Sequence, residues 1–577
     1  MEFKTLAYYL AQLEATASRN KITEILAELL KKASANEIDK ICYLSLGQLA
    51  PLYAGIEFNL AEKLMIRVIG KAFGVAEEKV KKEYKSIGDL GEVGEKLNPV
   101  KSGQKTKLTV EKVYQKLYEV AKEGGAGSVE RKISKTATLL NELDGLSVRY
   151  VIRIPLGRLR LGFSELTILD ALSWMITGNK SKRKEIEEAF NLQADIGQIT
   201  KIIKTKGISG LRSLEIQLGV PIMPALCQRL PNAEEIIKKM CRLGDKVAVE
   251  PKYDGTRLQI HWVKKKTSIF TRNLENVTHM FPDLVEALRK EVKAKEVIFD
   301  GEAIGFDPKT HRFLPFQETI KRKRKYEIGS KAKEIPLKYF AFDVLFKDGR
   351  DLISLPFNQR REILIKTVSA ASKTIIVSPQ IITEKAQELR KYHDEQIKKG
   401  LEGVVVKKWE AFYDPGRRGY TWVKLKQEKG KKGGGLSDTL DCVVMGYYKG
   451  KGKRAKFGIG GFLVGIREKE GGDQYLTISK IGTGLTDEQW REMRKRIDKV
   501  KVEEKPKEYL ADKNLFPDVW CEPKIVVEIE ADNITRSPIH SAKYALRFPR
   551  LVCFRDDKAP EEATTLSEAK KLYQLQG

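Results

Sequence analysis

The chain has 577 residues, 41% of them apolar and 32% charged, and its 106 Lys and Arg against 78 Asp and Glu leave a net charge of +28 at pH 7. That length predicts three or four domains, and the composition excludes a disordered chain and one that spans a membrane, since no apolar run approaches the roughly 20 residues that a bilayer requires. The six cysteines are scattered without a CxxC pair, which excludes a zinc ribbon or a disulfide framework and, with no signal-peptide layout at the N-terminus, predicts a cytoplasmic protein.

The surplus of positive charge predicts a polyanionic partner, foremost a nucleic acid. Two other interpretations stay open, namely a surface charged for solubility and the Lys- and Glu-rich surface of a thermophilic protein. Such surfaces are usually balanced in sign, which favours nucleic acid. Charge indicates the class of partner and no particular reaction.

Residues 1–217 are predicted to form an all-α domain, because apolar residues recur there at helical spacing. The segment 21–32 has one apolar face, formed by Ile22, Ile25, Leu26, Leu29 and Leu30. Apolar faces of this kind belong to the core by default. We therefore assign them a role in folding and none in function.

Two interruptions of the helical pattern are candidate DNA contacts. The turn at 124–128 contains Gly125 and Gly127, and a glycine-rich turn between helices exposes backbone N–H groups that can hold a phosphate. The basic stretch that follows could hold a neighbouring phosphate through Arg153, Arg158 and Arg160. A plain turn and solvated arginines explain the same residues equally well.

After residue 217 the pattern changes to short alternating runs bounded by Gly, Asp and Pro, which predicts an α+β domain over 218–428. A segment rich in Lys and Gly, 426–438, predicts a hinge or linker. The strand-like runs in 429–577 have the spacing of a small β-barrel, and a short helical tail closes the chain.

The segment 250–257, EPKYDGTR, carries the strongest chemical signal. It places Lys252 at a strand end, beside an acid and a glycine that permits close approach. A lysine amine is a nucleophile only when unprotonated, and lowering its pKa from about 10.4 toward 7–8 takes roughly 4 kcal/mol, which burial and neighbouring cations supply. A KxDG string arises by chance on the order of once in ten chains of this size, so it is weak alone.

Six further motifs follow in order: TRNLENVT, FDGE, FAFDVLF, EGVVVK, WVKLK and RDDK. The series resembles the covalent nucleotidyltransferases, which comprise DNA ligases, RNA ligases and mRNA capping enzymes. The resemblance implies that Lys252 is the nucleophile and that the ring of Phe342 stacks on the purine. It also implies that the nucleotide is contacted by Glu250, Arg257, Arg272, Glu302, Arg418, Lys424, Lys426, Arg555 and Lys558.

The chemistry that such residues would perform is phosphoryl transfer, which depends on positioning and on electrostatic stabilisation. Glu302 and Glu402 are hard oxygen ligands suited to Mg²⁺, with Mn²⁺ as an alternative, although outside these motifs a surface ion pair would be the ordinary interpretation. We expect Lys424 and Lys426 to point to opposite faces of their strand, so that only one reaches the α-phosphate. The resemblance favours Lys424.

The layout of the whole chain favours one branch of the superfamily. RNA ligases and capping enzymes lack a large helical domain before the lysine, whereas ATP-dependent DNA ligases of the archaeal and eukaryotic replicative type carry one. NAD-dependent bacterial ligases add four zinc-binding cysteines. We therefore expect a DNA-binding domain at 1–217, an adenylation domain at 218–428 and an OB-fold domain at 429–577.

The resemblance also implies partners and a reaction. The partner is nicked double-stranded DNA. A sliding clamp is also expected from kinship, although the peptide around Gln104 does not fit a clamp-binding motif. We expect a monomer that associates with the nucleoid and with no membrane. ATP loads AMP onto the lysine, AMP passes to the 5′-phosphate of the nick, and the 3′-hydroxyl displaces it. The run 321–325 becomes a candidate DNA contact through Lys321, Arg322 and Arg324.

Two alternatives remain. The chain could act mainly on RNA ends or as a capping-type enzyme of the same superfamily. It could also be a catalytically inactive DNA-binding protein, although every chemical residue of the motifs is present.

Overall fold

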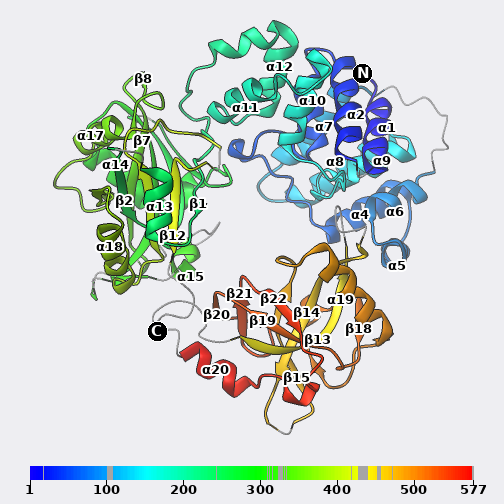
Figure 1. Ribbon diagram of the computed structural model, residues 1–577. Helices are drawn as coiled ribbons and strands as arrows, with labels where there is room; N and C mark the ends of the chain where they lie inside the picture. Colours follow the sequence, from blue (N-terminus) through cyan, green and yellow to red (C-terminus); the bar gives the residue numbers. More distant parts are fainter. Residues whose placement is uncertain are drawn as a thin grey trace. The chain divides into compact units, whose positions relative to one another are not determined.

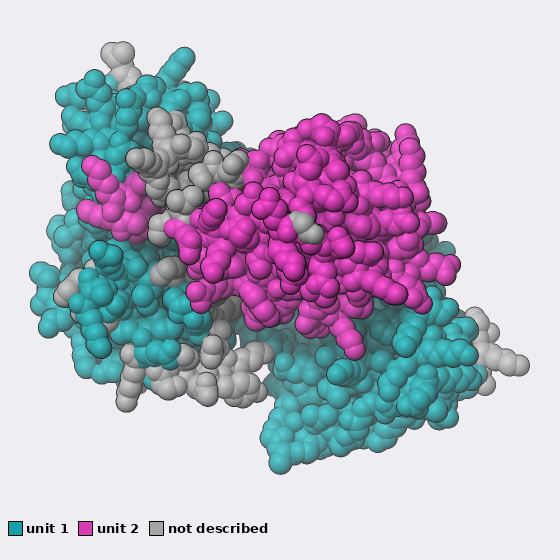
Figure 2. Space-filling model, turned by 90° about the horizontal axis from the view of Figure 1, so that it is seen from below, with its two compact units in different colours: residues 1–396, 403–425 teal, residues 397–402, 426–577 magenta. Residues whose placement is uncertain are grey.

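The computed structural model describes residues 1–16, 18–99, 108–241, 244–264, 266–307, 309–310, 312–314, 316–322, 329, 332, 334–416, 419–426, 439–450, 457–470 and 472–574 (Figure 1). They divide into two compact units. The first comprises residues 1–396 and 403–425, and the second comprises 397–402 and 426–577 (Figure 2). Residues 427–438 of the expected linker lie outside the described residues, and the domain boundaries at 217 and 428 stay predictions.

The N-terminal part of the first unit is helical, as predicted. Its helices are α1 (Phe3–Glu14), α2 (Arg19–Lys32), α3 (Ile38–Ser45), α4 (Glu62–Phe73), α5 (Glu77–Ile87), α6 (Leu90–Leu97), α7 (Val110–Lys122), α8 (Ser128–Asn141), α9 (Gly145–Arg153), α10 (Glu165–Thr177), α11 (Arg183–Leu192) and α12 (Ile196–Lys206). In α2 the Ser18 side chain caps the start by accepting from the N–H of Lys21, and the predicted apolar face is buried. This face packs against α10.

Close packing between α6 and α9 depends on two glycines. A Cβ at Gly94 would lie 2.2 Å from Cδ1 of Ile152, and one at Gly91 would lie 2.6 Å from the carbonyl oxygen of Arg149. Both distances are shorter than van der Waals contact, so a larger residue would force the helices apart. The glycines of α6 thus set the spacing of this helix pair.

The rest of the first unit contains two sheets. One has the order β4 (Lys266–Thr271), β3 (Thr256–Val263), β5 (Glu296–Asp307), β7 (Leu337–Lys347), β8 (Arg350–Asp351), with β6 (Arg312–Phe313) on β5 and β9 (Ile375–Val377) on β7. The other has the order β1 (Gln228–Arg229), β12 (Trp422–Lys426), β11 (Gly403–Lys408), β2 (Val247–Pro251), β10 (Ile381–Thr383). The chain passes from the second sheet to the first between β2 and β3, and this connection carries Lys252.

Helices cover these sheets. They are α13 (Ala233–Met240), α14 (Pro282–Glu291), the short α15 (Phe316–Thr319), α17 (Phe357–Thr367) and α18 (Ala386–Lys398). Apolar residues of α13 and α18 form one buried cluster with β2, β11 and β12, whereas those of α14 and α17 join the cluster on β3, β5 and β7. Each sheet thus has its own core beneath its helices, and a further buried cluster joins Ile298 and Leu345 of the first sheet to Trp422 of β12.

The second unit is built around a curled sheet that is antiparallel except for the parallel pair of β15 and β17. It has the order β16 (Lys501–Val502), β18 (Val519–Cys521), β13 (Leu440–Lys449), β14 (Ile459–Arg467), β15 (Tyr475–Ile481), β17 (Tyr509–Leu510), and β13 also pairs with β19 (Val526–Glu530), which pairs with β22 (Arg550–Phe554). A hairpin, β20 (Asn533–Arg536) and β21 (Tyr544–Arg547), and the helices α19 (Asp487–Lys499) and α20 (Leu566–Gln574) complete it. This confirms the predicted β-rich C-terminal fold and its helical tail.

Within the described ranges, no helix combines the length and the apolar character that crossing a membrane requires.

Candidate active site

Lys252 lies in the connection between the two sheets and is half-buried. Its backbone N–H donates to the carbonyl oxygen of Gly403 at 2.9 Å, which ties the connection to the start of β11. Gly255, the glycine of the KYDG motif, lies so close to β5 that a Cβ would be 2.3 Å from the carbonyl oxygen of Ala303. The glycine is therefore needed to bring Lys252 and the strand of Glu302 together.

Glu302 shares an electrostatic environment with two of the motif cations. Burial raises the pKa of the Glu302 carboxyl to about 7, while the charges of Lys252 and Arg257 act to lower it. Opposite charges lower an acid's pKa only over short distances, so the predicted nucleophile and the predicted metal ligand are near neighbours. A carboxyl held at this balance can exchange its proton for a metal cation near neutral pH.

The thiol of Cys227 marks where the motif cations converge. Burial raises the pKa of Cys227, and Arg257, Lys407, Lys252 and Lys424 oppose that rise. These four residues come from three segments of the chain, namely 250–257, β11 and β12. In the sequence this cysteine is one of six scattered thiols, and no local pattern indicates that it belongs to the site.

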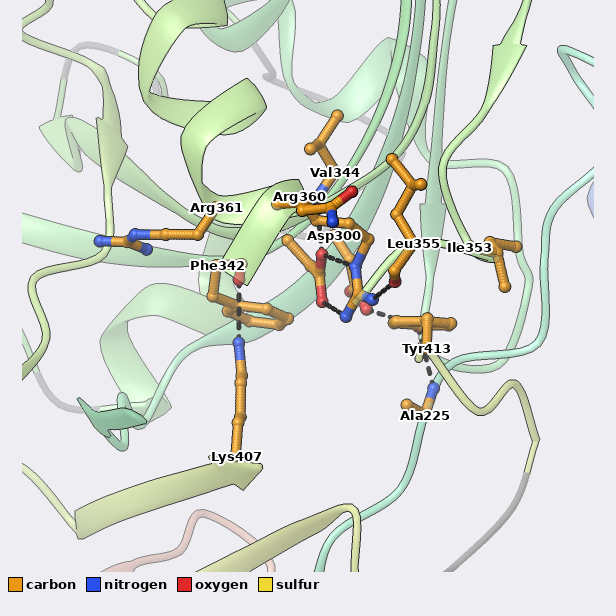
Figure 3. Close-up of polar contacts among 12 residues, drawn as sticks. Ala225, Asp300, Phe342, Val344, Ile353, Leu355, Arg360, Arg361, Lys407 and Tyr413 are labelled. Carbon is orange, nitrogen blue, oxygen red and sulfur yellow. Dashed lines mark hydrogen bonds and ion pairs between the residues drawn. The ribbon is translucent and has the colours of Figure 1, made fainter. Parts of the chain in front are cut away.

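The guanidinium of Arg257 is held by residues to which the sequence motifs assign no role. Its guanidinium forms two hydrogen bonds with Asp300, at 3.0 and 2.6 Å, and donates to the carbonyl oxygen of Ala225 at 2.7 Å. The hydroxyl of Tyr413 donates to Asp300 at 2.8 Å and accepts from the N–H of Ala225 at 3.0 Å (Figure 3). Burial would lower the pKa of Arg257, but Asp300 more than offsets this and keeps it charged.

Phe342, on β7, is half-buried and sits among cations and a second aromatic ring. Its ring centroid lies 5.8 Å from that of Trp422 in an edge-to-face arrangement, 5.4 Å from the guanidinium carbon of Arg257 and 4.7 Å from Nζ of Lys407. These contacts restrict the ring to one orientation. A fixed aromatic ring of this kind can stack on a purine.

Glu250 and Lys407 form a buried ion pair, with Nζ of the lysine 2.9 Å from Oε2 of the glutamate. Lys407 also donates to the carbonyl oxygen of Phe342 at 2.8 Å (Figure 3). Arg361, on α17, contacts the other carboxylate oxygen of Glu250 at 3.5 Å and donates to the carbonyl oxygen of Ser378. Glu250 was predicted to bind the nucleotide, whereas Arg361 was missed.

The strand that carries Lys424 and Lys426 corrects one expectation. β12 is a regular strand, in which residues two apart share a face, so the expectation that these lysines point to opposite faces was wrong. The two lysines differ in their surroundings instead. The charge of Lys424 acts to lower the pKa of Cys227, whereas Nζ of Lys426 lies 3.1 Å from a carboxylate oxygen of Glu402.

The protein side chains of the site supply only part of the ligands that a Mg²⁺ ion requires. Among the described residues, no group of three or more His, Cys, Asp and Glu side chains is arranged to hold a metal ion. Mg²⁺ characteristically takes one or two carboxylates and completes its shell with water and substrate phosphates. Glu302, whose burial leaves its charge poorly compensated, fits such a site.

The other predicted nucleotide contacts are dispersed. Arg272 is exposed in the turn that follows β4, and Arg418 lies outside the described residues. In the second unit, Asp441 of β13 holds both Arg555 and Lys558, at 3.1 and 2.6 Å. Arg555 is also paired with Asp557 at 2.7 Å. The positively charged side chains of RDDK are thus held by a strand of the same unit.

Arg153 does not support its predicted role as a DNA contact. Its side chain is 1% exposed and is paired with Glu14 at 2.7 Å, Asp89 at 3.0 Å and Glu92 at 3.1 Å. A guanidinium saturated by three carboxylates inside a helical core cannot reach a phosphate without breaking that core. This residue joins α9 to α1 and α6.

The neighbouring arginines and the glycine turn remain at the surface. Arg158 pairs with Glu62 and is about half exposed, and Arg160 adopts a left-handed backbone with its side chain 32% exposed. Gly125 and Gly127 both have φ of +73°, and Arg131 holds their turn by donating to the carbonyl oxygens of Gly124 and Ala126. Their contact with DNA stays a prediction.

The basic run 321–325 also divides into different roles. Lys321 is exposed and pairs with Glu318 at 2.5 Å. Arg322 is 1% exposed, binds Asp283 at 2.5 Å and donates to the carbonyl oxygen of Ile335. Arg322 is therefore a core anchor, which corrects its prediction as a phosphate contact, and Arg324 lies outside the described residues.

Three family models match this chain. One for the N terminus of DNA ligases matches residues 2–173, one for the ATP dependent DNA ligase domain matches 224–426, and one for the ATP dependent DNA ligase C terminal region matches 455–558. The chain is 45% identical over 584 residues to a probable DNA ligase of Dictyoglomus turgidum and 37% identical over 596 residues to a DNA ligase of Sulfolobus acidocaldarius. In both cases the match covers 100% of this chain and 98% of the relative.

Solved structures show the same fold. The structure named Pmar-Lig_PreS3 has a TM-score of 0.55 at 17% identity, over 95% of this chain and 99% of that one. At this identity the likeness concerns the architecture alone.

Proposed function

Because this chain belongs to the family of ATP-dependent DNA ligases, which seal nicks in DNA, we propose that Lys252 is the nucleophile that takes up AMP. The observation that carries the proposal is the convergence of Lys252 with Arg257, Lys407 and Lys424 on the half-buried thiol of Cys227. Neighbouring cations disfavour the protonated amine. They also attract the phosphates of the nucleotide, so one cluster serves both activation and binding.

The first step forms a P–N bond between Nζ of Lys252 and the α-phosphorus of ATP. The bond from that phosphorus to the bridging oxygen breaks, pyrophosphate leaves with the electron pair, and the amine proton passes to solvent. Negative charge accumulates on the phosphoryl oxygens as this occurs, and Lys424 is placed to stabilise it. Arg257, fixed by Asp300, supports the ring of Phe342 on which the adenine stacks.

In the second step the 5′-phosphate at the nick attacks the same phosphorus and releases Lys252 as the leaving amine, which regains a proton. In the third step the 3′-hydroxyl attacks the 5′-phosphate, loses its proton and expels AMP. Each step transfers a phosphoryl group, so the same cationic residues can serve all three.

We assign Mg²⁺ as the divalent metal, held by Glu302 and Glu402, with Mn²⁺ as an alternative. When bound, the metal neutralises phosphate charge and polarises the phosphoryl oxygens. Arg555 and Lys558, organised by Asp441, orient the pyrophosphate. Contact of DNA with Arg158, Arg160, Lys321 and the turn at Gly125 and Gly127 is part of the same proposal.

The test of the nucleophile uses α-labelled nucleotides. The purified chain is incubated with labelled ATP, GTP or NAD and denatured, and the label retained on the protein is measured. We expect retention from ATP, its loss in Lys252→Ala, and its persistence in Lys264→Ala, an exposed lysine beyond β3. Label retained in Lys252→Ala would contradict the assignment.

The DNA substrate is tested with matched nicked duplexes in which one or both strands at the nick are RNA. We expect sealing of the all-DNA nick to be the fastest. Faster sealing of RNA ends would favour the RNA-ligase alternative, and binding without sealing would favour an inactive DNA-binding protein. Light scattering tests the monomer, and co-elution with a purified sliding clamp tests that partner.

A further inference from the structure

The two cations of the RDDK motif, Arg555 and Lys558, are already paired with carboxylates in this structure. Each oxygen of Asp441 holds one of them, with Oδ1 3.1 Å from Nη1 of Arg555 and Oδ2 2.6 Å from Nζ of Lys558. Asp557 accepts from the other two nitrogens of the Arg555 guanidinium, at 2.9 and 2.7 Å. All three nitrogens of that guanidinium thus donate to carboxylate oxygens.

The formal charges of this cluster cancel. Arg555 and Lys558 supply two positive charges. Asp441 and Asp557 supply two negative ones, and Glu528 adds a further negative charge 3.9 Å from Nη1 of Arg555. Pyrophosphate is a multivalent anion, and a cluster whose charges cancel attracts it weakly. A carboxylate must therefore leave these cations before they can bind pyrophosphate fully.

The backbone of Asp441 is held independently of its side chain. The residue lies near the start of β13, opposite Glu528 of β19. Glu528 in turn lies opposite Cys553 of β22, two residues before Arg555 (Figure 1). The N–H of Asp441 donates to the hydroxyl of Thr564 at 2.9 Å, and its carbonyl oxygen accepts from the N–H of Thr564 at 2.9 Å. Strand pairing therefore fixes this carboxylate beside the motif cations.

The acids around RDDK differ in what they hold. Asp556 is paired with Arg496 of α19 at 3.0 Å, away from the two cations. The side chain of Asp557 is 64% exposed, so water and salt screen its charge, whereas that of Asp441 is 16% exposed. Within the described ranges, Asp441 is the carboxylate that bridges both cations, and it is therefore the strongest internal competitor for them.

We propose that Asp441 is a positioning residue that competes with pyrophosphate for Arg555 and Lys558 and so promotes its release after the AMP transfer. This inference rests on the proposed roles of Lys252 and of the RDDK cations. A carboxylate and a phosphate offer the same kind of charged oxygen to both donors. When pyrophosphate leaves, Asp441 replaces it as the counter-ion, so that neither cation loses its partner.

Competition and a purely structural role predict changes of opposite sign. If Asp441 only held the two cations in place, its neutralisation would let them disperse, and pyrophosphate would bind more weakly. If Asp441 competes, its neutralisation frees both cations, and pyrophosphate binds more tightly. The direction of the change in Asp441→Asn therefore distinguishes the two roles.

The test measures the reverse of self-adenylation. The full-length protein is labelled with AMP from α-labelled ATP, freed of nucleotide and mixed with pyrophosphate and Mg²⁺. An oxygen of pyrophosphate attacks the phosphorus of the lysyl-AMP, the P–N bond breaks, and the amine takes a proton from solvent as labelled ATP leaves. The measured quantity is the pyrophosphate concentration that gives the half-maximal rate of label loss. We expect Asp441→Asn to lower it about tenfold.

The forward reaction gives a second readout. In Asp441→Asn the KM for ATP should fall about threefold while kcat does not rise, because the freed cations bind the phosphates of ATP before as well as during the transfer. Asp441→Glu keeps the negative charge. It should therefore restore both quantities to within about threefold of wild type.

The matched control is Asp532→Asn. Asp532 is another carboxylate of the second unit, and its Oδ1 lies 2.8 Å from Nη2 of Arg550, outside the RDDK motif. Its replacement removes the same charge and an ion pair of the same kind. It should leave the half-maximal pyrophosphate concentration and the KM for ATP unchanged, and it thus separates the net charge of the unit from competition at RDDK.

A higher or an unchanged half-maximal pyrophosphate concentration in Asp441→Asn would overturn the proposal. Asp441→Ser decides the matter if Asp441→Asn does not fold, because it also removes the charge and leaves the backbone bonds to Thr564 in place. Failure of the wild-type protein to retain any label would instead count against the proposed role of Lys252. Wild-type label that pyrophosphate does not remove would count against the role assigned to the RDDK cations.

Discussion

At the scale of single residues, Glu302 is the group whose ionisation depends most directly on solution conditions. Its folded pKa of about 7 lies above the ordinary value of about 4.3. The folded state therefore binds this proton more tightly than the unfolded state does. The contribution of Glu302 to the free energy of unfolding is therefore fully present below the unfolded pKa, and it is lost as the pH rises through about 7.

A divalent metal competes with that proton, which predicts a pH-dependent affinity. For a ligand with a pKa of about 7, the apparent affinity for Mg²⁺ should be about tenfold weaker at pH 6 than at pH 8. Calorimetric titration of the protein with Mg²⁺ and a non-hydrolysable ATP analogue measures it. In Glu302→Gln the pH dependence should disappear, and equal wild-type affinities at both pH values would contradict the assignment.

We predict that replacing Arg153 has a large effect on the free energy of unfolding and none on DNA binding. Arg153→Met leaves three carboxylates facing one another in the helical core, so we expect a loss of about 3–5 kcal/mol in the free energy of unfolding. Arg158→Met, whose side chain is exposed, should change it by less than about 1 kcal/mol. Urea denaturation of both variants tests this; an unaltered Arg153→Met midpoint would show that the ion pairs contribute little.

The residues that sequence could and could not identify differ in one physical respect. Lys252, Glu302 and Phe342 stand in short ordered motifs, so their approximate places were predictable without the fold. Asp300, Tyr413 and Arg361 act through hydrogen bonds to residues distant in sequence, which only the tertiary structure brings near. Arg153 and Arg160 look alike in a basic stretch, yet burial separates them.

At the scale of elements, helical periodicity was sufficient to predict the N-terminal helices, because an apolar stripe must be buried wherever it occurs. It could not predict how closely two helices approach. The glycines of α6 read as weak helix formers in sequence, and their role appears only against α9. The prediction that Lys424 and Lys426 point to opposite faces was wrong for a different reason, because residues two apart in a strand share a face.

The α6–α9 contact predicts a specific rescue. Gly94→Ala places a Cβ against Ile152 and should destabilise the protein by about 1–3 kcal/mol, even though Ala is the better helix former. Shortening the partner in the double variant Gly94→Ala, Ile152→Val should recover part of that loss. Thermal unfolding of the three proteins tests this, and a Gly94→Ala variant more stable than wild type would show that the helices adjust freely.

At the scale of the whole molecule, the proposed function assigns roles to residues of both compact units. The charge surplus correctly predicted a polyanionic substrate, and motif order predicted the family. The pairing of Arg555 and Lys558 with Asp441 could not be predicted, because Asp441 lies on a strand more than a hundred residues earlier. Of the hinge predicted at 426–438, Lys426 belongs to β12 and residues 427–438 lie outside the described residues.

We predict that replacing Lys558 slows the steps of the reaction to different extents. Lys558→Ala should slow self-adenylation by about 100-fold, since it removes a cation from the pyrophosphate, and should slow sealing of a pre-adenylated nick far less. Single-turnover assays of the two steps measure the difference, with Lys570→Ala in α20 as an exposed control. Equal losses in both assays would contradict this division of roles.

The strand β12 limits how this protein can change over evolutionary time. The ring of Trp422 lies beside the cations of Lys407 and Arg257. The charge of Lys424 acts to lower the pKa of Cys227, and Lys426 pairs with Glu402. Because side chains alternate between faces, inserting or deleting one residue here would turn the following contacts to the wrong side together. Such a strand can accept point substitutions but not changes of length, so insertions among relatives should accumulate in the flanking loops and spare these five residues.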